Sequence, residues 1–130
     1  MTTIEVGRDQ WQNFCDRITK LQHGALINIH VDEPDGRSNS IAQDAPLRSI
    51  RLDDKSDPCN TLLLIETGLP GQKGIEHKII EPIHLRLKNG RDGHYNLAHI
   101  QAENGTTVLT MHPGLSSALA SEFDRVPTSR

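Results

Sequence analysis

Most of the chain consists of short apolar segments separated by turn-forming residues, and this pattern restricts the possible folds more than any other feature. Residues 25–31 place alternate apolar side chains on one face, residues 61–66 form a continuous apolar run, and residues 83–88 alternate apolar with basic side chains. Such segments are typical of β-strands with at least one buried face. The pair Asn104-Gly105 favours a tight hairpin between two neighbouring strands. The sequence therefore predicts an antiparallel sheet.

An amphipathic helix precedes the strands. Residues 8–22 carry apolar side chains at i, i+3, i+4 and i+7, and Gly24 follows as a helix-ending residue. Residues 113–125 repeat an apolar side chain every four residues and predict a short C-terminal helix. We therefore expect an α+β fold, in which the N-terminal helix packs on an antiparallel meander sheet or incomplete barrel of about six or seven strands.

The length of 130 residues fits a single domain. We expect the helix and sheet core to occupy residues 8–112, and the C-terminal helix and tail to occupy residues 113–130. The polar residues 32–46 predict a long loop. The glycine-rich residues 67–74 predict a hairpin connection, because they lack the order of glycine and lysine that a phosphate-binding loop requires.

Composition and charge exclude several classes of protein. The net charge of −3 excludes a polybasic protein that binds nucleic acid or a membrane surface by charge alone. No apolar run approaches the roughly 18 residues of a membrane-spanning helix. The N-terminus lacks the pattern of an export signal, and two cysteines do not make a disulfide framework. We therefore expect a cytoplasmic protein with no membrane association.

One strand face carries a group of basic side chains. His84, Arg86 and Lys88 alternate with apolar residues on one predicted strand, and Arg91 follows in the next turn. Such a strip could bind an anion or nucleic acid, which is one alternative function. The aromatic content of 3% argues against base stacking, so an ordinary solvent-exposed strand face is the simpler interpretation.

Seven histidines raise the further alternative of a metal protein or small hydrolase. Neighbouring strands could bring His77, His84 and His99 together, but the sequence has none of the close histidine spacings typical of metal sites. It also lacks the serine motif of common hydrolases. We therefore predict no catalytic residue, no metal site and no cofactor, and we favour a protein without enzymatic activity.

The C-terminal helix adds a second apolar stripe, formed by Leu115, Leu119 and Phe123. This stripe could pack on the chain's own sheet or on a partner. One N-terminal helix covers only part of a sheet of this size, and an antiparallel sheet needs its apolar face covered. We therefore expect self-association as a homo-oligomer or binding to a protein partner. A non-enzymatic protein-binding or self-associating module is the function that the sequence favours.

Several short motifs are shared with known proteins. They are Trp11-x-x-Phe14 in the helix, Pro46-Leu47 at a strand entry, the segment from Ile75 to Ile83 with His77 and Pro82, and the hairpin from Asn104 to Leu109. Through these motifs, residues 8–111 resemble a group of small bacterial proteins of unknown function. The resemblance implies a helix followed by an antiparallel sheet and a bacterial source, and it implies no activity.

Overall fold

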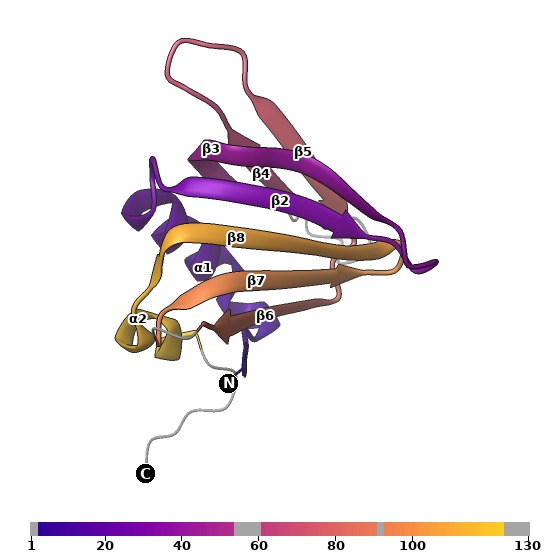
Figure 1. Ribbon diagram of the computed structural model, residues 1–130. Helices are drawn as coiled ribbons and strands as arrows, with labels where there is room; N and C mark the ends of the chain where they lie inside the picture. The colour runs from indigo at the N-terminus through magenta and orange to yellow at the C-terminus, as the bar shows by residue number, and fades with distance from the viewer. Residues whose placement is uncertain (1–2, 54–60, 91–92, 124–130) are drawn as a thin grey trace.

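Antiparallel strands and two α-helices make up the structure, a computed structural model that describes residues 3–53, 61–90 and 93–123 (Figure 1). The elements in chain order are β1 (Thr3–Glu5), the 3-10 helix η1 (Arg8–Gln10), α1 (Trp11–Leu21), β2 (Leu26–Asp32), β3 (Ser38–Asp53), β4 (Leu62–Thr67), β5 (Ile75–Ile80), β6 (His84–Asn89), β7 (Tyr95–Ala102), β8 (Gly105–Leu115) and α2 (Ser117–Ser121). The predicted α+β class is confirmed, with eight strands in these ranges rather than six or seven.

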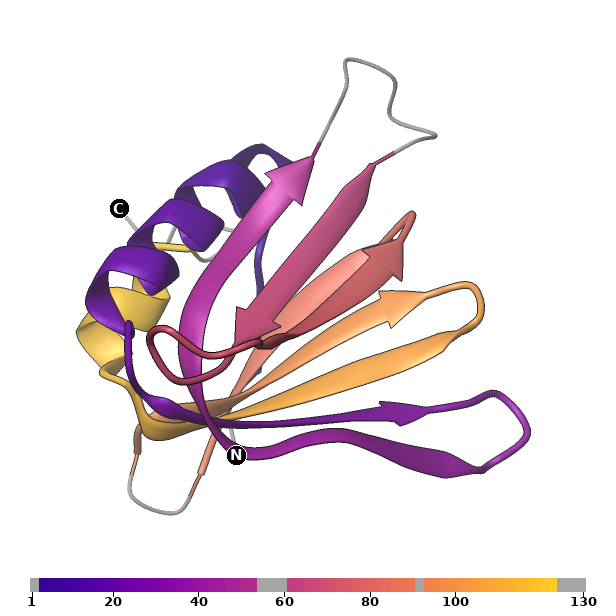
Figure 2. The same cartoon turned by 90° about the horizontal axis from the view of Figure 1, so that it is seen from above.

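The strands form one antiparallel sheet in the order β1-β6-β7-β8-β2-β3-β4-β5. The long strand β3 belongs to two halves of this sheet, because its first part pairs with β2 and its last part with β4. We call β1, β6, β7, β8 and β2 the large half-sheet, and β4 and β5 the small half-sheet. The sheet bends at β3, as the view from above shows (Figure 2). The bend brings β5 to β8, where His77 Nε2 lies 3.1 Å from Thr107 Oγ1.

The expectation of a loop over residues 32–46 is wrong for most of its length. The turn is short, with the Glu33 amide donating to the Arg37 carbonyl, and β3 already begins at Ser38. Residues 38–40 are exposed, so this end of the strand has no buried face to require apolar residues. At Asp44 the backbone has a φ of 47°, and its amide donates to Asn28 Oδ1 at 2.8 Å, where the ladder with β2 is irregular.

Helix α1 packs against the core and against the part of β3 that has no neighbouring strand on that side. Trp11, Phe14, Cys15 and Ile18 are buried, which confirms the predicted amphipathic helix. The Thr19 hydroxyl donates to the Ile50 carbonyl at 3.0 Å and accepts from the Ile50 amide at 2.9 Å. A single side chain thus satisfies both main-chain groups of one β3 residue beyond the end of β2.

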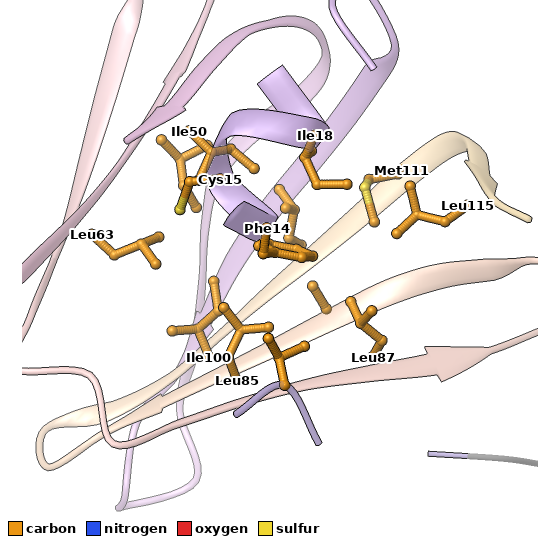
Figure 3. Packing of buried hydrophobic residues seen from close by; sticks show 14 of the residues in the cluster. Phe14, Cys15, Ile18, Ile50, Leu63, Leu85, Leu87, Ile100, Met111 and Leu115 are labelled. Atoms are coloured by element: carbon orange, nitrogen blue, oxygen red, sulfur yellow. The ribbon is translucent and has the colours of Figure 1, made fainter. Parts of the chain in front are cut away.

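The core lies between the two half-sheets and α1, and most of its side chains are aliphatic, with the aromatic Trp11, Phe14, Tyr95 and Phe123 among them (Figure 3). Strands from both halves contribute to it, with Leu63 from β4 and Ile100 from β7 fully or almost fully buried. The C-terminal helix is shorter than predicted, because β8 continues through Pro113 and Gly114. Helix α2 begins after Ser116, whose hydroxyl accepts from the Leu119 amide.

Candidate functional site

The predicted basic strip lies on the outer face of β6. His84, Arg86 and Lys88 are half-exposed and alternate with the fully buried Leu85 and Leu87. The structure therefore places these three side chains together, as their spacing predicted. Arg91, the fourth member of the predicted strip, lies outside the described residues.

A carboxylate from β1 pairs with two members of this strip. Glu5 lies opposite Arg86 in the β1–β6 ladder, and its Oε1 accepts from Arg86 Nε at 3.0 Å. Its Oε2 accepts from His84 Nδ1 at 2.8 Å. Burial alone would raise the pKa of Glu5, but the hydrogen bonds from His84 and Arg86 outweigh it and hold the pKa below 4.5. The outer face is therefore less basic than the sequence of β6 alone indicates.

The neighbouring strand β7 adds a histidine beside the strip. His99 of β7 lies opposite Arg86, and burial lowers its pKa. The charges of Lys88, His30 and Arg86 lower that pKa further, against the opposing effect of Asp32. His99 is therefore held in its neutral form near neutral pH.

The three histidines of the metal or hydrolase hypothesis do not meet. His77 lies on the inner face of β5, paired across the ladder with the buried Ile65, and burial lowers its pKa. His84 and His99 lie on the outer face of the large half-sheet. In the part of the chain that the structure describes, no group of three His, Cys, Asp or Glu side chains could hold a metal ion.

The C-terminal apolar stripe is part of the chain's own core. Leu115 and Phe123 are 1% and 0% exposed, and Leu119 is partly buried against the core. The ring of Phe123 meets that of Phe14 of α1 edge to face. These side chains therefore cover the apolar sheet face for which the sequence suggested a partner.

The glycine-rich segment surrounds the guanidinium group of Arg48. Arg48 of β3 donates to the carbonyls of Gly68, Leu69 and Gln72, and pairs with Glu66 at 3.3 Å. The guanidinium thus satisfies carbonyl groups of the connection between β4 and β5. This connection is the expected hairpin.

Among the described residues the sheet has two edge strands, β1 and β5. Strand β5 ends the sheet and pairs only with β4. The Glu81 amide donates to the Thr61 carbonyl, which sets the alternation of the ladder. In that alternation the main-chain groups of Glu76, Lys78 and Ile80 point away from β4. In the sequence this strand is a six-residue segment without proline, and nothing within the segment indicates that it would be the last strand of the sheet.

A small pocket lies beside this edge, between β5 and the β7–β8 turn. Its volume is about 80 Å³. The pocket is lined by Val31, His77, Lys78, Ile79, Ile80, Ala102, Asn104, Gly105 and Thr107. At Gly105 a Cβ atom would lie 2.9 Å from the Asp32 carbonyl oxygen, so glycine allows β2 and the turn to approach closely here.

A larger hollow of about 410 Å³ lies at the start of α1 and includes Trp11 and His84. The Arg8 guanidinium lies 4.6 Å from the centre of the Trp11 ring and donates to Thr61 Oγ1 at 2.6 Å. The Trp11 indole donates to the Val6 carbonyl at 3.0 Å. Arg8 and Trp11, two residues that line this hollow, thus each have a hydrogen-bond partner.

No helix in the described ranges has the length and apolar character needed to cross a membrane.

Comparisons with known proteins place the chain in a family. No curated protein and no solved structure is significantly similar to the chain. Residues 2–117 match the family model described as "Family of unknown function (DUF5335)", and the chain therefore belongs to that family.

Proposed function

We propose that the chain is a non-enzymatic protein-binding module that takes up an extended segment of a partner as an additional strand on β5. The observation that carries this proposal is the outward direction of the main-chain groups of Glu76, Lys78 and Ile80. Natural proteins protect sheet edges with very short strands, prolines, inward charges or charged side chains such as lysine, and β5 has the last of these at Glu76 and Lys78. The opposite edge, β1, has three residues, whereas β5 has six and contains no proline.

The side chains of β5 also suit a contact surface. Ile75 and Ile80 are 45% and 57% exposed, and Ile83 in the following connection is 52% exposed. An added strand would gain main-chain hydrogen bonds along the edge and apolar contacts at both ends.

A short segment suits this edge better than a second copy of the chain. Two β5 strands joined across a two-fold axis would place both large half-sheets on the same side of the combined sheet. The β7–β8 turn lies beside β5 on that side, at the pocket that contains Asn104 and Gly105. The turns of the two copies would then compete for the space under the joined edges. Self-association therefore becomes the alternative that the test must detect.

The test is an NMR titration with a blocked hexapeptide of alternating threonine and valine. We expect the amide signals of Glu76, Lys78 and Ile80 to shift, because these groups would form the new hydrogen bonds. A matched peptide, N-methylated at the residues that face β5, should cause no shift. Binding unaffected by methylation, or shifts confined to other strands, would overturn the proposal, and sedimentation of the free protein would reveal a dimer.

A protein variant provides the complementary test. Lys78→Pro removes an outward N–H while the ladder bonds of His77 and Ile79 to β4 remain. We expect this variant to lose peptide binding, and Lys78→Thr to retain it. Thermal unfolding of both variants identifies any loss that comes from unfolding.

Anion binding on the outer face of β6 is the second candidate function. The observation that favours it is the pair of half-exposed basic side chains, Arg86 and Lys88, that alternate with buried leucines along β6. We expect Lys88→Ala to weaken binding to a single-stranded oligonucleotide and to reduce its dependence on salt. Lys73→Ala removes the same charge from the exposed β4–β5 connection and serves as the matched control. Equal effects of the two substitutions would contradict this candidate.

A further inference from the structure

The pocket beside β5 lies where an added strand would direct alternate side chains. Because strand side chains alternate between faces, every second residue of the added segment would point toward the large half-sheet. The surface below it includes Val31, Ala102, Gly105 and Thr107. The pocket therefore selects the side chain that enters it by size.

The volume of about 80 Å³ limits that side chain to a small apolar group. An engineered apolar cavity of about 150 Å³ binds benzene, so a space of about half that volume suits a group smaller than an aromatic ring. A valine side chain has this size, whereas an aromatic ring does not fit without displacing Ala102 or Thr107.

Acidic residues surround this edge. Glu81 follows the pocket residue Ile80 directly, and Glu103 follows Ala102. The hairpin between β2 and β3 adds further acidic groups next to Val31. Among the described residues, the charged groups of this edge and hairpin are the acidic Asp32, Glu33, Asp35, Glu76, Glu81 and Glu103 and the basic Arg37, Arg51 and Lys78, with Arg51 2.9 Å from Glu76.

Contacts within the hairpin leave an acidic excess. Arg37 is already engaged by Asp35 at 2.7 Å and by Glu33 at 3.7 Å. Lys78 is then the basic side chain next to the pocket, against Glu81 and Glu103. The negative electrostatic potential of these acidic groups attracts positively charged segments and repels another copy of this acidic chain.

On the basis of the proposed strand addition, we infer that the partner is a basic, extended peptide segment with a small apolar side chain seated in the pocket beside Ala102. Its main chain pairs with the outward groups of β5. Its lysine or arginine residues lie toward Glu81 and Glu103, and its valine-sized residue enters the pocket.

The experiment compares fluorescently labelled hexapeptides that share one alternating backbone. The peptides carry lysine and valine, glutamate and valine, threonine and valine, or lysine and tryptophan. We expect the lysine–valine peptide to bind at least about tenfold more tightly than the glutamate–valine peptide, and this ratio to fall as salt is added. The lysine–tryptophan peptide should bind more weakly than the lysine–valine peptide, because its ring exceeds the pocket.

Matched protein variants locate the charge effect. Glu81→Gln combined with Glu103→Gln should reduce the preference for the lysine–valine peptide. Asp16→Asn removes an acidic charge from the exposed face of α1, distant from the hairpin tips in Figure 2, and should leave the preference unchanged.

The outcomes separate this inference from the proposed function. Equal binding of the lysine, glutamate and threonine peptides would overturn the basic partner while leaving strand addition in place. Equal binding of the valine and tryptophan peptides would overturn the role of the pocket. Absence of binding by every peptide, or equal binding of an N-methylated lysine–valine peptide, would overturn both the inference and the proposed function.

Discussion

The rings of Phe14 and Phe123 meet edge to face, with centroids 5.3 Å apart and ring planes at 80°. This contact joins the helix at the start of the fold to the residues that follow α2, and both side chains are almost completely buried. Such aromatic pairs contribute about 0.5–1.5 kcal/mol beyond the burial of their apolar area. The C-terminal turn is therefore a structural part of the core.

Removing the second ring tests this role. We expect Phe123→Ala to lower the free energy of unfolding by about 3–5 kcal/mol, because it leaves a cavity beside Phe14. Phe123→Leu, which fills part of that cavity, should lower it less. Urea unfolding followed by circular dichroism measures both values. A loss below about 1 kcal/mol for the alanine variant would contradict the role of Phe123 in the core.

The enclosure of Arg48 predicts a steric effect at Gly74. A Cβ atom there would overlap the Thr67 carbonyl oxygen and lie 2.7 Å from Arg48 Nη1. We expect Gly74→Ala to destabilise the protein by about 1–3 kcal/mol, as overpacking commonly does. Gly71→Ala is the comparison, because a Cβ atom at Gly71 meets nothing within 4 Å and only its φ of 76° opposes the change. Thermal unfolding should rank Gly74→Ala as the less stable variant.

The pairing of Glu5 predicts a dependence of stability on pH. Because the folded protein holds the pKa of Glu5 below 4.5, its contribution is complete above that pH and is lost as pH falls through the lowered pKa. The Glu5 side chain is 27% exposed, so we expect only about 1 kcal/mol. At neutral pH, Glu5→Gln should be less stable than the native chain, and the difference should disappear in acid. A difference that stayed constant with pH would contradict the ion pairing.

The burial of Cys15 predicts an unreactive thiol. Burial, assisted by the charge of Asp16, raises the pKa of Cys15 to about 12, so the thiolate is scarce at neutral pH. In a Cys59→Ser background we expect slow labelling by a thiol reagent in the folded protein and fast labelling in urea. Rapid labelling without denaturant would show that α1 opens readily from the core.

The sequence predicted those parts of the fold in which one face of an element is buried. The stripe of Trp11, Phe14 and Ile18 identified α1, and the alternation around Leu85 identified β6. The pattern of apolar residues did not predict the structure where the chain leaves the core. The first residues of β3 are exposed in a projecting hairpin, so they contain polar residues and resemble a loop.

Other differences depend on contacts between distant residues. Strand β1 has three residues, too few to show a period, and is held by its ladder with β6. The pairing of Glu5 with Arg86 could not be inferred because nothing near either residue indicates the other. Likewise, the identity of β5 as the last strand depends on the order of the whole sheet. The basic strip was predictable from local alternation, whereas the edge at β5 and its pocket were not.

The contact between Phe14 and Phe123 and the pairing of Ile4 with Leu87 also affect how the protein is made. During synthesis, Ile4 and Phe14 leave the ribosome well before their partners exist. Contacts between residues so far apart in the chain slow folding, because a long loop must close before they form. The apolar strand β4 therefore stays without its complete cover while translation continues. A newly made chain depends on rapid completion of its C-terminal turn, or on a chaperone, to avoid aggregation.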